Sequence, residues 1–198
     1  MFYSVMRAIA YPFVRLLYWF RITGLENIPK DGKAIICCNH IKMLDVVFLV
    51  IACPRKICFM AKQELFRNPI VAWFFRKMCA FPVVRGPQSR EAIEHAVSLI
   101  RDGGILGIFP EGKRCREGRP TKAKSGIAMI LSQVDAPVIP AAVYYKDNRR
   151  IFARANVGFG APIPHELLEM KDNSREELRR VSATIMDCII KEWEKING

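Results

Sequence analysis

A histidine and an aspartate stand five residues apart in the segment NHIKMLD at 39–45, directly after an apolar run at 34–38. A loop histidine and an acid about one helical turn further on can meet, so that the carboxylate fixes the imidazole tautomer and raises its basicity. The pair His40 and Asp45 is therefore a candidate general base with its orienting acid. The alternative is a histidine that only packs beside a helix N-terminal aspartate, since this spacing alone is common.

Basic residues follow two further apolar runs. Arg85 ends the run FPVVR at 81–85, and Lys113 and Arg114 follow FPEG at 109–112. Between positions 113 and 124 there are six basic residues and a single acid. An arginine fork and a lysine point charge suit a phosphate group, although a solvated charged face is the alternative. The segment is not a P-loop, because the leading glycine spacing of that motif is missing.

The rest of the chain alternates short apolar runs with helical patterns. The expected strands are 34–38, 57–61, 81–84, 105–109, 137–145 and 150–160, and the expected helices are 43–53, 68–78, 89–100, 125–133 and 174–196. This alternation predicts an α/β fold with a mixed, largely parallel sheet flanked by helices. Functional residues in such folds gather at the carboxyl ends of strands. His40, Arg85 and the loop at 109–115 are therefore expected at one edge of the sheet.

The first 22 residues, MFYSVMRAIAYPFVRLLYWFRI, have a different pattern. Arg7, Arg15 and Arg21 interrupt the apolar residues too often for a spanning helix, and no signal-peptide pattern is present. On a helical wheel these arginines lie opposite a broad apolar face, which comprises Phe2, Val5, Met6, Ile9, Phe13, Leu16, Leu17 and Phe20. The pattern is typical of a helix that lies in a membrane interface, with a kink or break at Pro12.

The alternative for this segment is an amphipathic helix docked on the core of its own domain. We divide the chain accordingly into an amphipathic membrane-interface segment at 1–22 and a globular domain at 23–198. The length of 198 residues and the 51% of hydrophobic residues suit one packed domain.

The composition restricts the partners. A net charge of +12 indicates an anionic partner, which is a nucleic acid, a membrane surface or a phosphorylated substrate. Nucleic acid is disfavoured, because no basic motif is interleaved with aromatic residues. The seven cysteines form no CxxC pair and are expected to be buried, reduced thiols. No metal site is expected, because His40, His95 and His165 keep no ligand spacing with the cysteines.

Taken together and in order, these residues resemble the glycerolipid acyltransferase family, in particular its bacterial 1-acylglycerol-3-phosphate acyltransferases. Asn39, His40 and Asp45 match the Asn-His-x4-Asp block of that family. FPVVRG at 81–86, FPEGKRC at 109–115 and VIPAAV at 138–143 resemble its other three blocks, and the similarity spans about residues 22 to 163. The chain departs from the family locally, with Lys42, Lys113 and Cys115 at positions where the family often has Ser, Thr and Ser.

The resemblance implies a mechanism. His40 would be the general base toward the free hydroxyl of a lysophosphatidate, and Asp45 would orient it. Arg85 and Arg114 would hold the substrate phosphate, with Glu111, Gly112 and Lys113 shaping that pocket. The acyl donor would be a thioester of coenzyme A or of acyl carrier protein, and no metal or other cofactor is implied.

The resemblance also implies a setting. Membrane lipids, the lysophospholipid acceptor and the acyl donor are the expected partners, and the product would be phosphatidate for phospholipid synthesis. The expected location is peripheral, on the cytoplasmic face of a bacterial membrane. Two alternatives stay open: an acyltransferase for a different lysolipid acceptor, and a membrane-bound scaffold without catalysis.

Overall fold

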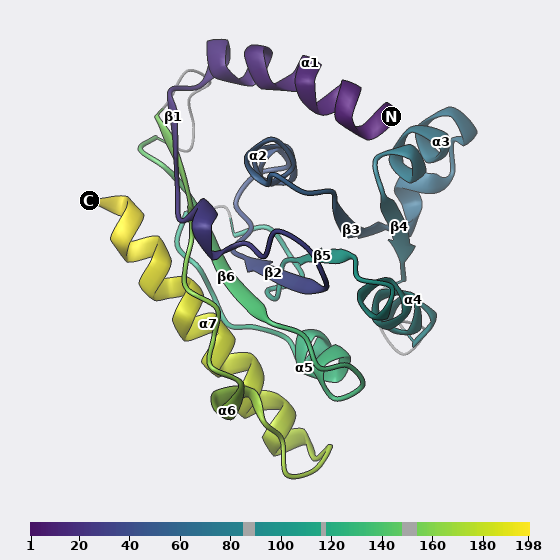
Figure 1. Cartoon of the computed structure of the whole chain (residues 1–198), viewed down its shortest axis with the longest axis vertical. Coiled ribbons are helices and arrows are strands. Elements are labelled where there is room, and N and C mark those ends of the chain that lie inside the picture. Colours follow the sequence, from purple (N-terminus) through teal and green to yellow (C-terminus); the bar gives the residue numbers. More distant parts are fainter. Residues whose placement is uncertain (85–89, 116–117, 148–153) are drawn as a thin grey trace.

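Seven strands of the described chain form one sheet in the order β1-β7-β6-β2-β5-β3-β4 (Figure 1). The computed structural model describes residues 1–84, 90–115, 118–147 and 154–198. The strands are β1 (Phe20–Thr23), β2 (Ala34–Cys38), β3 (Ile57–Lys62), β4 (Ala80–Val83), β5 (Ile105–Ile108), β6 (Val138–Tyr145) and β7 (Ala155–Phe159). All neighbouring strands are parallel except β6 and β7, which are antiparallel. The sheet therefore brings the carboxyl ends of β2, β3, β4, β5 and β6 to one edge.

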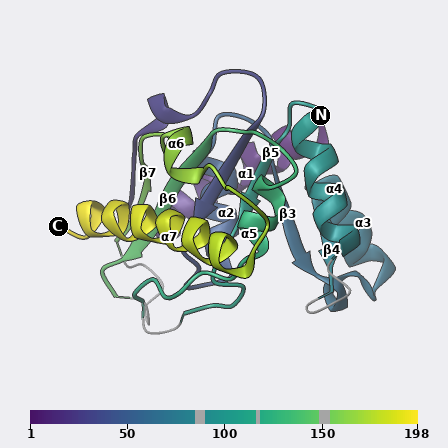
Figure 2. The ribbon, with the colours of Figure 1, turned by 90° about the horizontal axis from the view of Figure 1, so that it is seen from below.

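Helices cover both faces of this sheet (Figures 1 and 2). On one face lie α1 (Phe2–Leu17) and α2 (Leu44–Ala52), and the other carries α4 (Arg90–Arg101), α5 (Gly126–Leu131), α6 (His165–Leu168) and α7 (Arg175–Asn197). The helix α3 (Pro69–Lys77) lies beside β4, and short 3-10 helices are found at η1 (Leu25–Asn27) and η2 (Gln63–Phe66). Each face has its own cluster of buried apolar side chains. The predicted α/β fold with a mixed, largely parallel sheet is thus confirmed.

Local sequence signals explain where the helices begin. The side chain of Asn68 accepts hydrogen bonds from the backbone N–H of Ile70 and Val71, and Pro69 occupies the first turn of α3. Ser174 caps α7 by accepting from the backbone N–H of Glu177 at 3.2 Å. No helix in the described ranges has the length and apolarity that crossing a bilayer requires.

The prediction of a helical segment that extends through residue 22 is wrong at its end. The helix α1 runs through Pro12 as one element and ends at Leu17, after which the chain is extended and forms β1 against β7. Tyr18 and Phe20 are buried while Trp19 and Arg21 are exposed, an alternation that is typical of a strand. The start of the globular domain therefore lies before residue 20.

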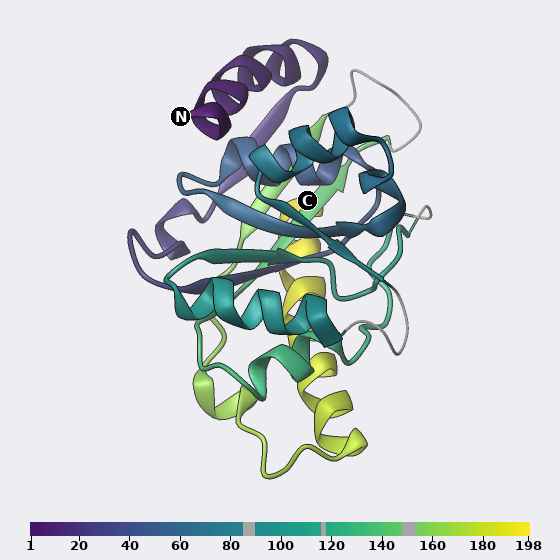
Figure 3. The same ribbon diagram turned by 90° about the vertical axis from the view of Figure 1, so that its right-hand side faces the viewer.

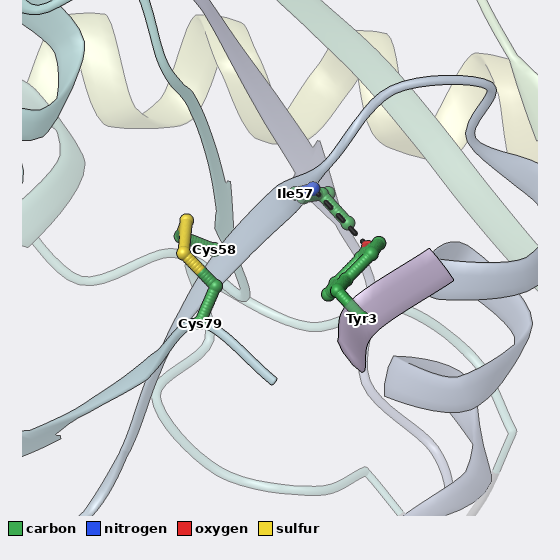
Figure 4. Close-up of a disulfide and its surroundings, with 4 residues drawn as sticks. All are labelled: Tyr3, Ile57, Cys58 and Cys79. Carbon is green, nitrogen blue, oxygen red and sulfur yellow. Dashed lines mark hydrogen bonds between the residues drawn. A yellow bond between two sulfur atoms is a disulfide. The ribbon is translucent and has the colours of Figure 1, made fainter. Parts of the chain in front are cut away.

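The prediction that all cysteines are reduced is also wrong for one pair. Cys58 and Cys79 are joined by a disulfide, with a Cα–Cα distance of 4.7 Å (Figure 4). These two residues are 21 positions apart in sequence but adjacent in the sheet, because Phe59 is in register with Ala80 across the β3–β4 pair. The other five cysteines are free.

Candidate active site

The loop that follows β2 is fixed by the side chain of Asn39, which is completely buried. Its amide oxygen accepts a hydrogen bond from the backbone N–H of Val143 at 2.8 Å, and its amide nitrogen donates to the backbone oxygen of Val143 at 3.0 Å. The asparagine thus continues the pairing of β2 with β6 through its side chain. The next residue, His40, leaves the sheet edge in a defined direction.

His40 and Asp45 meet as the sequence predicted. The Nδ1 atom of His40 lies 2.8 Å from Oδ2 of Asp45, and the histidine side chain is 18% exposed while the aspartate is fully buried. The hydrogen bond to the carboxylate places the proton of the neutral imidazole on Nδ1 and leaves Nε2 as the basic nitrogen. A partly exposed imidazole with a buried carboxylate behind it is suited to general-base catalysis.

Asp45 is itself held in place by several donors. Its Oδ2 accepts from the backbone N–H groups of Ile41 at 2.5 Å and Lys42 at 2.8 Å, and its Oδ1 accepts from the hydroxyl of Tyr145 at 2.6 Å. Burial and the neighbouring Asp45 carboxylate raise the pKa of Tyr145, so that its hydroxyl remains a donor. These bonds satisfy a carboxylate that would otherwise be buried at high cost in free energy.

Glu111 connects the two loops of the site. This residue is 1% exposed, and its Oε2 accepts from the backbone N–H of His40 at 2.8 Å. Its Oε1 accepts from the backbone N–H of Thr121 at 2.7 Å and from the hydroxyl of the same residue at 3.1 Å. The backbone N–H of Cys115 donates to the backbone oxygen of His40 at 2.6 Å. Glu111 therefore positions the histidine loop rather than facing solvent, and its place in a substrate pocket stays a prediction.

A stack of aromatic rings supports the imidazole. The ring of His40 lies 4.1 Å from that of Phe109, at 21° between the planes, and Phe109 in turn stacks on Phe59 at 5.8 Å. Gly107 makes room for this stack, because a Cβ atom at that position would lie 2.3 Å from the Phe59 ring. The stack limits the rotation of the imidazole about its Cβ–Cγ bond.

Three cations lie at the same edge of the sheet. Lys113 and Arg114 are exposed in the loop after β5, and Gly112 has a φ of 64° that turns the chain there. The Nζ atom of Lys42 lies 4.3 Å from the centre of the Tyr145 ring, and partial burial lowers the pKa of this lysine. The predicted phosphate ligand Arg85 lies outside the described residues.

Two positioning residues were not predicted from the sequence. Tyr145 is 100 positions from Asp45 and Thr121 is 10 positions from Glu111, and neither stands in one of the quoted motifs. Of these two residues, only Tyr145 could have been found from the sequence, because it ends a predicted strand beside the site.

The fold and these contacts define a class: an α/β protein with a hydrogen-bonded histidine and aspartate at the carboxyl ends of its parallel strands. A family model described as Acyltransferase matches residues 20–144, which is more than half of the chain. The chain belongs to this acyltransferase family, as its motifs indicated.

Two named relatives give the degree of similarity. The chain is 37% identical over 123 residues to the 1-acyl-sn-glycerol-3-phosphate acyltransferase of Bacillus subtilis (strain 168). The aligned region covers 62% of this chain and 61% of that protein. It is 32% identical over 184 residues to the protein of the same name from Borreliella burgdorferi. This aligned region covers 88% of this chain and 72% of that protein. The chain thus spans about three fifths of the length of the first of these relatives.

A solved structure supports the fold independently. The crystal structure of the 1-acyl-sn-glycerophosphate (LPA) acyltransferase PlsC from Thermotoga maritima matches 99% of this chain and 80% of that protein, with a TM-score of 0.77 and 24% sequence identity. At this identity the match establishes that the two proteins share a fold.

Proposed function

We propose that this protein transfers a fatty acyl chain from an acyl thioester to the sn-2 hydroxyl of 1-acyl-sn-glycerol-3-phosphate, which yields phosphatidate. The observation that carries this proposal is the hydrogen bond between His40 and Asp45, whose Nδ1 and Oδ2 atoms lie 2.8 Å apart at the edge of the sheet beside a basic loop. Family membership and the names of the two bacterial relatives support the same reaction.

The proposed chemistry needs one proton carrier. Nε2 of His40 takes the proton of the acceptor hydroxyl as the oxygen attacks the thioester carbonyl, and the Asp45 carboxylate stabilises the imidazolium that forms. The tetrahedral intermediate then collapses with cleavage of the carbon–sulfur bond. The imidazolium returns its proton to the leaving thiolate, so the base is regenerated in the same cycle.

The test of this function is a matrix of donors and acceptors on purified protein in detergent. Acyl-coenzyme A and acyl carrier protein thioesters are each combined with lysophosphatidate, lysophosphatidylcholine and lysophosphatidylglycerol, and thiol release is measured. We expect thiol release with lysophosphatidate and formation of phosphatidate in equal amount. Turnover only with an acceptor that lacks the phosphomonoester would favour the alternative lysolipid acyltransferase.

The basic loop after β5 is proposed to bind the acceptor phosphate, with Arg114 as its main ligand. We expect Arg114→Ala to reduce kcat/KM for lysophosphatidate by about ten- to hundredfold, because a hydrogen bond to a charged group contributes roughly 1.5–3 kcal/mol. The KM for the donor should change little. Arg101→Ala is the matched control, since Arg101 is exposed at the end of α4, before the start of β5, and therefore at the opposite edge of the sheet from the loop that follows β5. Full activity of Arg114→Ala on lysophosphatidate would assign this loop to the solvated surface.

A peripheral location on the cytoplasmic face of the membrane is part of this proposal, and the orientation of α1 supports its contact with lipid. This helix packs on the domain through Tyr3, Val14 and Arg7, whose guanidinium donates to the backbone oxygens of Cys53 at 2.8 Å and Pro54 at 3.0 Å. Its opposite face is both apolar and exposed, and consists of Val5, Ile9, Phe13 and Leu16. The two interpretations of this segment are thus compatible, since one face is docked and the other is free for lipid.

One arginine of this segment faces the domain. Arg7 is bound to backbone oxygens of the protein and is therefore not expected to contact lipid headgroups. A deletion through residue 22 cannot test membrane binding by α1 alone, because it would remove most of β1 as well as α1. Substitutions on the exposed face are therefore preferred to truncation.

A further inference from the structure

The helix α3 has an apolar face that the rest of the described protein does not cover. Ile70 is 77% exposed, Trp73 is 52% exposed and Phe74 is 41% exposed, while Ala72 is the helix residue that is buried. Contiguous exposed apolar patches on soluble proteins usually mark an interaction site. The proposed acyl transfer does not use this face.

This face is continuous with the exposed face of α1. The ring of Phe2 packs edge-on against Trp73 at 5.3 Å and against Phe74 at 6.1 Å between centroids. Figures 1 and 3 show the start of α1 beside α3. We call the two exposed faces together the α1–α3 surface, which comprises Val5, Ile9, Phe13, Leu16, Ile70, Trp73 and Phe74.

The charges around α3 have a single sign. Arg67 precedes the helix, Arg76 and Lys77 end it, all three are exposed, and positions 67–78 contain no acidic residue. The nearest acid in the preceding η2 segment, Glu64, is paired with Lys62 at 2.8 Å. Aromatic and aliphatic side chains flanked by basic residues suit an anionic lipid surface, into which the apolar groups insert while the cations contact headgroups.

We propose that α3 is a second membrane-docking element, and that the α1–α3 surface as a whole binds an anionic phospholipid bilayer. The inference deepens the proposed function, because a lipid substrate requires the site to reach a bilayer. β3 runs parallel to β5, and β5 to β2, so the carboxyl end of β3 lies at the edge that carries His40. The chain enters α3 from that end through η2. Contact between the start of α3 and the bilayer therefore holds this edge near the lipid.

The first test uses the tryptophans of the chain, which are Trp19, Trp73 and Trp193. A full-length variant with Trp19→Phe and Trp193→Phe retains only Trp73. On addition of vesicles of phosphatidylcholine and phosphatidylglycerol with brominated acyl chains, we expect its emission to shift to the blue and to be quenched. The control retains only Trp193, which lies on α7 at the opposite face of the sheet against Tyr144, and should not be quenched.

The second test compares matched surface variants in vesicle co-sedimentation. We expect Ile70→Ser with Trp73→Ser to reduce the partition coefficient by roughly ten- to hundredfold, because two large apolar side chains no longer enter the bilayer. The control pair is Met129→Ser with Leu167→Ser, two exposed apolar residues on α5 and α6, and should leave binding unchanged. Lys77→Glu should weaken binding to anionic vesicles more than to neutral ones, whereas Lys191→Glu on α7 should not.

The outcomes separate the inference from the proposed reaction. Acyl transfer to a dispersed short-chain acceptor should be retained by the α3 variants, because they do not touch the His40 loop. Equal partitioning of the two paired variants would overturn the inference, and so would an unquenched Trp73 at saturating lipid. A Trp73 signal that responds only to acyl carrier protein, or only to protein concentration, would also overturn it and assign the surface to a protein partner. Vesicle binding without acyl transfer to any acceptor would uphold the docking surface and refute the reaction.

Discussion

Replacing His40 with alanine is expected to lower kcat/KM for acyl transfer by about 10²- to 10⁴-fold, which is the usual contribution of a positioned general base. The ring that lies against Phe109 and points its Nδ1 at Asp45 would be lost, while the backbone bonds of His40 to Glu111 and Cys115 would be retained. The protein should therefore remain folded. The measurement is thiol release with lysophosphatidate, together with a thermal melt of the same sample.

His95→Ala is the matched control for this variant. His95 is exposed on α4, where its ring packs against Phe81 on the other face of the sheet, and its loss should leave turnover unchanged. Wild-type turnover by a folded His40→Ala protein would refute the assignment of the general base.

Replacing Asp45 with asparagine is expected to reduce kcat by about 10³- to 10⁴-fold, as the loss of the orienting carboxylate does in other enzymes of this geometry. The neutral amide cannot stabilise the imidazolium of His40. Its single oxygen can still accept from the backbone N–H groups of Ile41 and Lys42, and the hydroxyl of Tyr145 can turn to accept from the new amide nitrogen. The effect should therefore fall on kcat rather than on the KM for either substrate.

Steady-state kinetics of Asp45→Asn beside Asp172→Asn provide the comparison. Asp172 is exposed in the turn before α7, where it accepts a hydrogen bond from the backbone N–H of Ser174, and its replacement should not affect turnover. If Asp45→Asn lost activity only in proportion to a loss of folded protein, Asp45 would be a structural residue and not an orienting one.

The contact between His40 and Asp45 could be predicted from the sequence because it is local. Four residues separate His40 from Asp45, and the start of α2 at Leu44 brings the two side chains together without help from distant elements. The strand order did not have to be known for this. The approximate edge of the sheet at which Arg114 lies was predictable for a similar reason, since parallel strands end on the same side.

The residues that hold the pair depend on tertiary contacts and could not be predicted. Tyr145 reaches Asp45 only because β6 pairs with β2, and Glu111 reaches the backbone of His40 only because β5 pairs with β2 on its other side. The disulfide between Cys58 and Cys79 has the same origin, since it depends on the register of β3 with β4.

The error in the N-terminal segment has a different cause. Arginines at positions 7, 15 and 21 fit one helical face, so the helical pattern of the sequence continues past Tyr18. In the structure, the side chains alternate between buried and exposed from that residue on. A strand of four residues is too short to show a period of two against that background. Its existence is due to pairing with β7, a strand more than 130 residues further along the chain.

In the proposed mechanism, His40 activates the acceptor hydroxyl for direct attack on the thioester, without an acyl-enzyme intermediate. The most direct measurement is a single-turnover experiment in which the enzyme is in excess over a labelled acyl thioester. Thiol release and intact-protein mass are followed first without acceptor and then after addition of lysophosphatidate. We expect no thiol release and no added acyl mass before the acceptor is present, and then equal rates of thiol release and phosphatidate formation. A burst of thiol with an acyl group attached to the protein in the absence of acceptor would contradict this mechanism.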